Sequence, residues 1–282
     1  MILVTGATGT VGREVMRQLP VGASVRVLAR DPSRVVGAAP GAEIVRGDYG
    51  NPAALERAMR GVRSAFLVTN EVGGDQDARF VDVAVTAGVG HVVKLSAAAV
   101  EDVLADDLIT GWQRDAEELL RVSGMGWTLL RPRSFMSNSL SWAPSLRSER
   151  VVRALYGESV NACVDPRDIA DVAVRALTEP GHQGRAYTLT GPQAVSAVWQ
   201  TDRLAELLGR PVRFEELAPD QARVLWSRRH PAPVVEALLH SARRQREGAK
   251  AGVVRTVAEL TGRPASSFET WARDHLTAFA GG

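Results

Sequence analysis

The chain has 282 residues, of which 45% are hydrophobic and 23% are charged, and its formal net charge is +2. This composition excludes a disordered or fibrous chain, and the length suits one large α/β domain or one domain with a smaller annex. The small net charge favours neither a nucleic acid nor an anionic membrane as partner, and the single cysteine, Cys163, excludes an intrachain disulfide.

The amino terminus reads as a buried strand, a glycine-rich turn and a helix. Residues 1–5 (MILVT) are a short apolar run, and residues 10–20 carry apolar side chains at helical spacing. We expect Gly6 to permit a tight turn, Gly9 to let the backbone approach a pyrophosphate, and Gly12 to let the helix pack closely on the strand. The free N–H groups of the first helical turn would then face the anion. The pattern predicts a dinucleotide site.

The second strand, at residues 23–30, carries the signal for the choice of cofactor. In dinucleotide-binding folds an acidic residue at this strand's end binds the ribose hydroxyl, whereas arginine favours a 2′-phosphate. Here Arg30 ends the strand and Arg34 follows it, which favours NADP(H) over NAD(H). We expect Asp31 to cap a helical turn that begins at Pro32.

Strands and helices continue to alternate up to residue 132, which predicts a parallel, doubly wound sheet with right-handed crossovers. Such a sheet binds its ligand beyond the carboxyl ends of its strands. The expected strands are residues 42–48, 64–69, 91–97 and 127–132, and the expected helices are residues 51–62, 75–89 and 115–124. The residues that follow the strands are Gly47, Asp48, Tyr49, Thr69, Asn70, Ser96, Ala97 and Pro132 to Phe135.

After residue 136 the alternation loosens. We expect an NADP(H)-binding Rossmann domain at residues 1–135 and a smaller, mostly helical α/β substrate-binding region at residues 136–282. The chain would cross back to the sheet near residues 160–190. Serine-rich residues 137–150 suggest a mobile lid. The other expected elements are a helix at 166–181, a strand at 185–192, a helix and a strand within 201–217, and three or four helices from Pro219 onward.

Seven segments of the chain resemble one known family. They are TGATGTVG, LARDPSR, GDYGNPAALERAMRGV, VVKLSA, SGMGWTLLRPRSFMSN, VDPRDIADVAVRAL and YTLTGP. Together they are similar, over roughly residues 2–218, to the NmrA-like branch of the atypical short-chain dehydrogenase/reductase superfamily. This resemblance implies a Rossmann domain, a smaller carboxyl-terminal substrate domain, and bound NADP(H). Members of this branch include NADPH-dependent quinone, ketone and ether reductases, and also non-catalytic redox sensors that bind regulatory proteins.

The resemblance also implies which residues contact the cofactor, with Asp48 meeting the adenine amino group. The implied contacts, together with Gly12 from the glycine pattern, are Thr5, Gly6, Thr8, Gly9, Thr10, Val11, Gly12, Arg30, Arg34, Asp48, Thr69, Asn70, Ser96 and Phe135.

The catalytic pair of ordinary short-chain reductases is missing from this sequence. That pair is a tyrosine with a lysine four residues later, and the lysine lowers the pKa of the phenol. The residues four positions before Lys94 and Lys250 are Gly90 and Arg246. For Lys94, within a strand, we expect a packing role or a surface ion pair.

The acid found in many members of the NmrA-like branch is missing as well. In those relatives a histidine opens the helix that here contains Gln113, and glutamine releases no proton near pH 7. One explanation is that Ser96, Gln113 or a backbone N–H steadies the developing anion, and that water or a substrate phenol supplies the proton. A second is that Tyr156 or His230 swings in. A third is that the protein only senses NADP(H).

Four aromatic residues suggest the kind of substrate. Trp112, Phe135, Trp142 and Trp226 lie in segments that could converge over the nicotinamide, which would suit a flat, bulky, apolar molecule. The resulting hypothesis is an NADPH-dependent oxidoreductase that reduces a ketone or quinone carbonyl of an aromatic, polyketide-type substrate in bacterial antibiotic or other secondary metabolism. The alternatives are an NADP(H) sensor, or an ether reductase, imine reductase or isomerase of the same fold.

The remaining expectations concern localisation, metals and partners. The five histidines have no metal-ligand spacing, and no run of about 18 apolar residues occurs. We therefore expect a cytoplasmic monomer or homodimer that acts on a small molecule and binds neither a metal ion, a nucleic acid nor a membrane.

Overall fold

The computed structural model describes residues 1–37 and 41–280, and these residues form two compact units. Unit 1 comprises residues 1–100, 111–132 and 166–188, and unit 2 comprises residues 101–110, 133–165 and 189–282. Residues 281 and 282, at the end of the expected substrate-binding region, lie outside the described residues. None of the helices described is long and apolar enough to cross a membrane.

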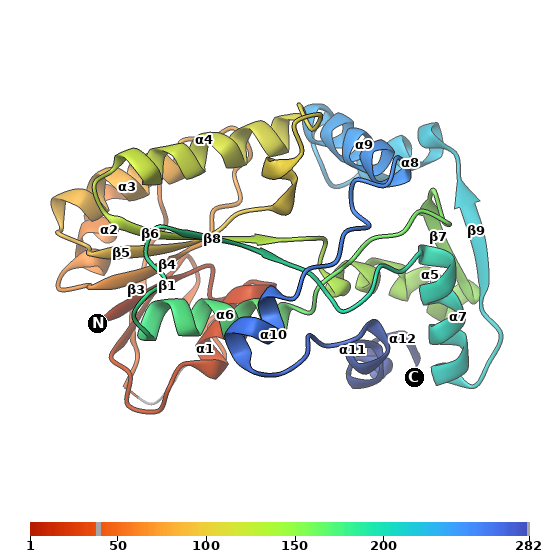
Figure 1. Ribbon diagram of the computed structural model, residues 1–282, viewed down its shortest axis with the longest axis horizontal. Helices are drawn as coiled ribbons and strands as arrows, with labels where there is room; N and C mark the ends of the chain where they lie inside the picture. The colour runs from red at the N-terminus through yellow and green to blue at the C-terminus, as the bar shows by residue number, and fades with distance from the viewer. Residues whose placement is uncertain (38–40, 281–282) are drawn as a thin grey trace. The chain divides into compact units, whose positions relative to one another are not determined.

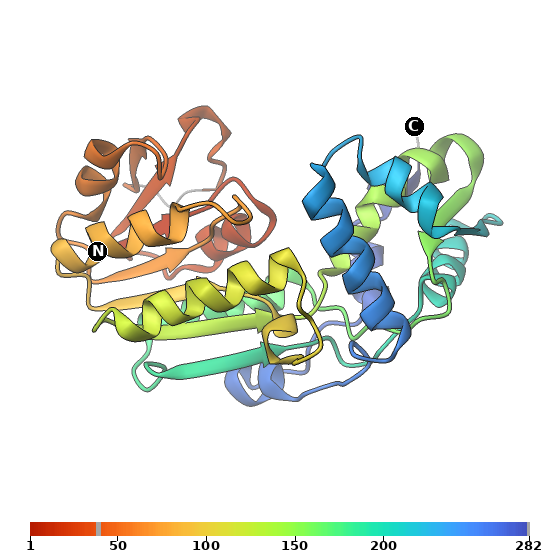
Figure 2. The same ribbon diagram turned by 90° about the horizontal axis from the view of Figure 1, so that it is seen from above.

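Unit 1 is built on a seven-stranded sheet in the order β3-β2-β1-β4-β5-β6-β8. The five neighbouring pairs from β3 to β6 are parallel. In Figure 2, β8 lies at the edge of this sheet, beside β6. The order and direction of the strands confirm the predicted doubly wound Rossmann fold. The strands are β1 (Ile2–Thr5), β2 (Val25–Ala29), β3 (Glu43–Arg46), β4 (Ser64–Leu67), β5 (His91–Leu95), β6 (Gly126–Pro132) and β8 (Arg185–Leu189).

Helices cover both faces of this sheet (Figure 1). One face carries α1 (Thr10–Gln18) and α6 (Pro166–Thr178), which pack against each other. The other face carries α2 (Pro52–Met59), α3 (Gln76–Thr86) and α4 (Leu108–Val122).

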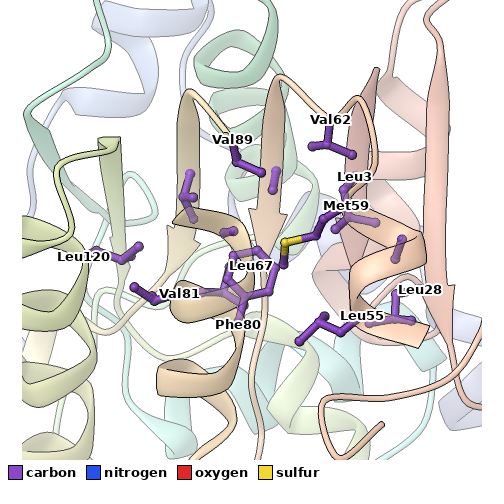
Figure 3. Packing of buried hydrophobic residues seen from close by; sticks show 14 of the residues in the cluster. Leu3, Leu28, Leu55, Met59, Val62, Leu67, Phe80, Val81, Val89 and Leu120 are labelled. Carbon is purple, nitrogen blue, oxygen red and sulfur yellow. The ribbon is translucent and has the colours of Figure 1, made fainter. Parts of the chain in front are cut away.

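Local sequence sets where these helices begin, and buried apolar side chains hold them to the sheet. The Asn51 side chain caps α2 by accepting a hydrogen bond from the Ala54 N–H at 3.0 Å, as the sequence predicts. Figure 3 shows Leu3 and Leu67 of the strands in one cluster with Met59 and Phe80 of the helices, and all four are fully buried. Burying side chains of this size stabilises the fold by about 1.5–3 kcal/mol each.

Unit 2 contains a two-stranded parallel sheet of β7 (Val151–Leu155) and β9 (Arg213–Leu217). Its helices surround the buried Trp271, Phe268 and Phe279 and a second, smaller apolar cluster. These helices are η3 (Met136–Trp142), α5 (Ala143–Glu149), α7 (Ala197–Leu208), α8 (Pro219–Trp226), α9 (Ala232–Arg246), α10 (Thr256–Thr261), α11 (Phe268–Asp274) and α12 (Leu276–Ala280). Two further short helical turns are η1 (Pro32–Arg34) and η2 (Ala98–Glu101).

The structure adds detail to the second half of the chain and corrects one expectation about it. Residues 137–150 contain the helical turns of η3 and α5, in which Met136, Ala143 and Leu146 are buried in the apolar cluster of unit 2, and their role as a lid stays a prediction. From Pro219 onward the described residues form five helices rather than three or four. Short helices of five to seven residues show too little periodicity to be separated in a sequence.

Candidate functional site

The glycine-rich turn has the geometry that its sequence predicts. Gly6 has a φ of +65°, and the Gly9 N–H donates to the Gly6 carbonyl at 2.9 Å, so the chain turns tightly after β1. A Cβ added at Gly12 would lie 2.1 Å from the Gly6 carbonyl oxygen. Only glycine therefore fits at position 12 without displacing the turn.

The start of α1 fits the pyrophosphate of a dinucleotide. Gly9 is the N-cap, so no side chain caps the helix, and no acidic residue lies in its first turn. The N–H groups of Thr10, Val11 and Gly12 lack partners inside the helix and carry its positive partial charge. Because the Val11 side chain is buried, only its backbone is able to contact a ligand. Thr8 is partly exposed and Thr10 is exposed at this turn.

Thr5 has a structural task in this turn. Its hydroxyl donates to the Phe66 carbonyl and accepts from the Val68 N–H, both at 2.9 Å. The side chain thus joins the ends of β1 and β4, and its contact with a cofactor stays a prediction.

Three arginines lie at or just after the ends of β2 and β3. Arg30 follows β2 directly, and both Arg30 and Arg34 are exposed. The Asp31 carboxylate caps η1, as predicted, by accepting from the N–H and hydroxyl of Ser33 at 3.1 and 2.6 Å. These hydrogen bonds, with the nearby charges of Arg34 and Arg46, hold the pKa of Asp31 below its usual value.

Arg46 is the member of this group that sequence reasoning missed. The register pairs Arg46 with Ala29, which places it beside the end of β2. The signal would have been the pairing of two parallel strands, which the sequence of either strand alone does not contain. Guanidinium groups are suited to binding a phosphate, and binding of the 2′-phosphate by Arg30, Arg34 and Arg46 stays a prediction.

The residues expected to meet the adenine lie after β3. Asp48 is exposed, and one carboxylate oxygen accepts from the Gly50 N–H at 2.9 Å. Tyr49 donates its hydroxyl to the Val68 carbonyl at 2.6 Å, and burial raises its pKa. Tyr49 is therefore a structural residue here and supplies no proton near neutral pH.

Lys94 is buried, which corrects the expectation of a surface pair. Its ammonium donates to Asp77 at 2.8 Å and to the Thr69 hydroxyl at 3.3 Å, and the side chain is fully buried. The indole N–H of Trp112 donates to the other oxygen of Asp77 at 3.0 Å. Burial lowers the pKa of Lys94, while the carboxylate of Asp77 raises it. The polar groups of these four side chains are thus engaged with one another.

The Ser96 hydroxyl donates to the Glu117 carboxylate at 2.6 Å. Glu117 also accepts from Arg131, at 2.9 and 2.6 Å, and from Arg121, at 2.8 Å. Burial raises the pKa of Glu117, but the hydrogen bonds from Arg131 and Ser96 outweigh it and keep the pKa below its usual value. The Ser96 proton is therefore committed to a carboxylate. Glu117 is one of several acidic residues in α4, so the sequence gave no sign that it accepts the hydrogen bond of Ser96.

Gln113 lies in the middle of α4 rather than at its start. The helix begins at Leu108, and Asp107 caps it by accepting from the N–H groups of Ile109 and Thr110, both at 3.0 Å. Gln113 therefore does not cap the amino terminus of α4. The side chain is only 7% exposed, yet its Oε1 has no hydrogen-bond partner among the described residues. Such a buried polar atom costs free energy unless a ligand satisfies it.

Asn70 is exposed, and its N–H donates to the Gln76 side chain at 3.1 Å. Unit 1 therefore brings Thr69, Asn70, Ser96 and Gln113 to segments that follow β4 and β5, where a Rossmann sheet holds its ligand.

The remaining expected site residues belong to unit 2. Phe135 is half-buried and pairs with Val164 in an isolated β-bridge. Trp142 and Trp226 each pack against an apolar cluster of this unit. The convergence of these three side chains with Trp112 over a nicotinamide stays a prediction.

The two residues considered as mobile acids also lie in unit 2. Tyr156 has a positive φ of 54°, and the Arg246 guanidinium lies 4.8 Å from its ring centroid. His230 is exposed. No group of three or more potential metal ligands occurs within residues 1–37 and 41–280.

Comparison with known proteins places this geometry in a family. A family model described as NAD(P)H-binding matches residues 6–180. The chain is 57% identical, over 99% of each chain, to a Streptomyces griseus protein named (4-alkanoyl-5-oxo-2,5-dihydrofuran-3-yl)methyl phosphate reductase.

Two solved structures share the fold of this chain. The NADPH-dependent quinone oxidoreductase of Escherichia coli, complexed with NADPH, superposes with a TM-score of 0.84 at 27% identity, over 98% of this chain and 100% of that one. The negative transcriptional regulator NmrA shares the fold with a TM-score of 0.75 at 16% identity, over 98% and 95% of the two chains.

The glycine turn, the uncapped start of α1 and these similarities agree. The chain belongs to the NAD(P)H-binding family, and it is an NAD(P)H-dependent reductase.

Proposed function

We propose that this protein uses NADPH to reduce the ring double bond of a phosphorylated 4-acyl-furanone. The substrate class comes from the Streptomyces griseus relative, whose name specifies an alkanoyl group, a ring carbonyl and a methyl phosphate on one dihydrofuran ring. Identity of 57% over nearly the whole of both chains supports a shared substrate class.

The chemistry of that substrate suits the residues of unit 1. In the named ring the double bond joins carbons 3 and 4, and carbon 4 also carries the alkanoyl group and adjoins the ring carbonyl. Bound NADPH would supply a hydride to carbon 3. The electron pair of the double bond would then move to carbon 4 and spread over both carbonyl oxygens, and a proton from water would complete the reduction at carbon 4. An anion delocalised in this way needs no strong acid for its formation.

The observation that carries the proposal is the engagement elsewhere of three candidate acids near the ends of β3, β4 and β5. Lys94 is paired with Asp77, the Ser96 proton is held by Glu117, and the Tyr49 hydroxyl is bonded to a carbonyl. A simple ketone would form a localised alkoxide that demands a proton at once. A doubly activated double bond, or a quinone, forms a stabilised anion instead.

Gln113 is the residue that we assign to the substrate. Its amide is almost fully buried, and Oε1 lacks a partner. Because no hydrogen bond holds Oε1 in place, the Gln113 amide is free to turn over and present its N–H₂ group, which would donate to a carbonyl oxygen on which the negative charge develops. Ser96 is better placed as a positioning residue, because its hydroxyl donates to Glu117.

The residues available to the cofactor fit NADPH better than NADH. The turn at Gly6–Gly12 and the start of α1 would hold the pyrophosphate, and Arg30, Arg34 and Arg46 would hold the 2′-phosphate. Asp48 keeps one carboxylate oxygen for the adenine amino group.

This substrate is smaller than the aromatic polyketide that the tryptophans suggested. That expectation relied on Trp112, Phe135, Trp142 and Trp226. The Trp112 N–H is bonded to Asp77, and the side chains of Trp142 and Trp226 pack against apolar clusters. Reduction of a quinone remains the second candidate, because the Escherichia coli relative is a quinone oxidoreductase at 27% identity.

The decisive experiment measures NADPH oxidation with the named furanone phosphate, with a quinone and with an isolated ketone. We expect turnover of the furanone phosphate and none of the isolated ketone. Gln113→Ala should lower kcat by about 10-fold or more while the Kd for NADPH stays unchanged, since one donor to the developing anion is lost. An unchanged kcat would remove Gln113 from the site, and preference for the ketone would overturn the proposal.

A further inference from the structure

Two cations of unit 2, Arg133 and Lys250, are near enough for their charges to interact, and neither forms an ion pair with a described residue. The Arg133 guanidinium makes no ion pair with any described residue, and its Nε is buried without a hydrogen-bond acceptor. The Lys250 ammonium donates at 2.7 Å only to a neutral group, the Ser241 hydroxyl. Neither residue has a part in the turn that fits the dinucleotide, which belongs to unit 1.

Backbone hydrogen bonds connect the segments that carry these two cations through two intervening segments. The Arg133 N–H donates to the Leu189 carbonyl at 2.9 Å. Two residues further on, the Gly191 N–H donates to the Ala162 carbonyl at 3.3 Å, and the Ala162 N–H donates to the Lys250 carbonyl at 2.9 Å. Three backbone hydrogen bonds therefore link the four segments that include Arg133 and Lys250.

The carboxylates of this region have other partners. Asp102 binds Arg244 through both oxygens, at 2.9 and 3.0 Å. Asp107 caps α4 through two N–H groups. Glu101 and Asp102 raise the pKa of Arg133, although burial has the larger, lowering effect. Burial and the neighbouring charge of Arg133 lower the pKa of Lys250 to about 8, against a smaller opposite effect of Asp107. Without a bound anion, the positive charges of Arg133 and Lys250 therefore repel each other.

We propose that Arg133 and Lys250 bind the phosphate monoester of the substrate. A planar guanidinium is able to donate two parallel hydrogen bonds to a phosphate, and an ammonium adds a compact charge. An anion with two negative charges would relieve the repulsion between the two side chains and would satisfy the buried Nε of Arg133. This assignment rests on the proposed function for the identity of the phosphate carrier, but the site itself rests on unit 2 alone.

The test compares two substrates that differ only in the phosphate. These are the (4-alkanoyl-5-oxo-2,5-dihydrofuran-3-yl)methyl phosphate and its free alcohol. In the unaltered protein, kcat/KM should be higher for the phosphate. Arg133→Gln and Lys250→Gln should each lower kcat/KM for the phosphate by about 10–100-fold, chiefly through KM, and should leave the alcohol nearly unaffected.

Matched variants separate the effect of losing a positive charge from a general loss of structure. Lys250→Arg keeps the charge and should retain the preference for the phosphate. Arg60→Gln removes an exposed cation of unit 1 and should change neither substrate's kcat/KM. Equal losses for phosphate and alcohol in the Arg133 and Lys250 variants would overturn the proposal, as would an unaltered protein without preference.

A binding experiment tests the phosphate site independently of the proposed reduction. Inorganic phosphate is titrated calorimetrically into protein saturated with NADP⁺, so that the dinucleotide site is already filled. We expect binding that Arg133→Gln and Lys250→Gln both weaken at least about 10-fold. If neither furanone is reduced, the proposed function fails, and this titration still decides the site. Phosphate binding that is equal in all variants, or absent from the unaltered protein, would refute the site.

Discussion

Replacing Gly12 with alanine tests the geometry of the cofactor turn. The added Cβ would lie 2.1 Å from the Gly6 carbonyl oxygen and 2.6 Å from its carbon, both of them backbone atoms. Ordinary contact begins near 3.4 Å, so the turn or α1 has to move by more than 1 Å. Forced overpacking of this kind costs about 1–3 kcal/mol. The better helix propensity of alanine returns about 0.5–1 kcal/mol.

We therefore expect Gly12→Ala to lower the free energy of unfolding by about 1–2 kcal/mol. NADPH affinity should fall at least about 10-fold, because the displaced turn no longer presents its N–H groups to the pyrophosphate. Urea denaturation with and without NADPH measures the first quantity, and fluorescence titration measures the second.

Gly111→Ala is the matched control for this substitution. Gly111 lies inside α4, and a Cβ there would have no atom within 4 Å. This variant should gain about 0.5–1 kcal/mol of stability and keep its NADPH affinity. If Gly12→Ala binds NADPH like the unaltered protein, the turn does not hold the pyrophosphate and the reasoning fails.

Three further predictions follow from named contacts. Arg34→Gln should reduce the preference for NADPH over NADH about 10-fold, measured as the ratio of the two Kd values, since one phosphate contact is lost; an unchanged ratio would remove Arg34 from the site. Lys94→Met should lower the free energy of unfolding by about 3–5 kcal/mol in urea, because it leaves the buried Asp77 carboxylate unpaired, and a loss below 1 kcal/mol would contradict this. Burial lowers the pKa of His91 from 6.5 to about 4, so the unfolded chain takes up more protons and stability should fall as the pH drops from 6.5 to 4. His91→Gln should flatten that fall, and identical pH profiles would refute the assignment.

The fold could be predicted from the sequence because its signals are local. The apolar run before Gly6, the Asn51–Pro52 cap and the Asp31 cap each lie within a few residues, and all three are confirmed. The helical turns within residues 137–150 could not be predicted, because serine content describes composition, whereas burial of Leu146 depends on distant helices. The short carboxyl-terminal helices were miscounted for a similar reason.

The candidate site could be predicted only in part, because its contacts join distant positions. The ion pair of Lys94 with Asp77 spans 17 residues, and the hydrogen bond of Ser96 to Glu117 spans 21. No periodicity links such pairs. Gln113 was selected by its place in the family pattern, but its position inside α4 and its unpartnered oxygen required coordinates.

The most direct test of the proposed reaction follows the hydrogen that leaves the cofactor. NADPH carrying deuterium at both C4 positions is incubated with the protein and the furanone phosphate, and the product is analysed by NMR. Our account predicts deuterium at ring carbon 3, hydrogen from water at carbon 4, and an intact alkanoyl ketone. Deuterium on a new carbinol carbon of the side chain, or no oxidation of NADPH at all, would contradict it.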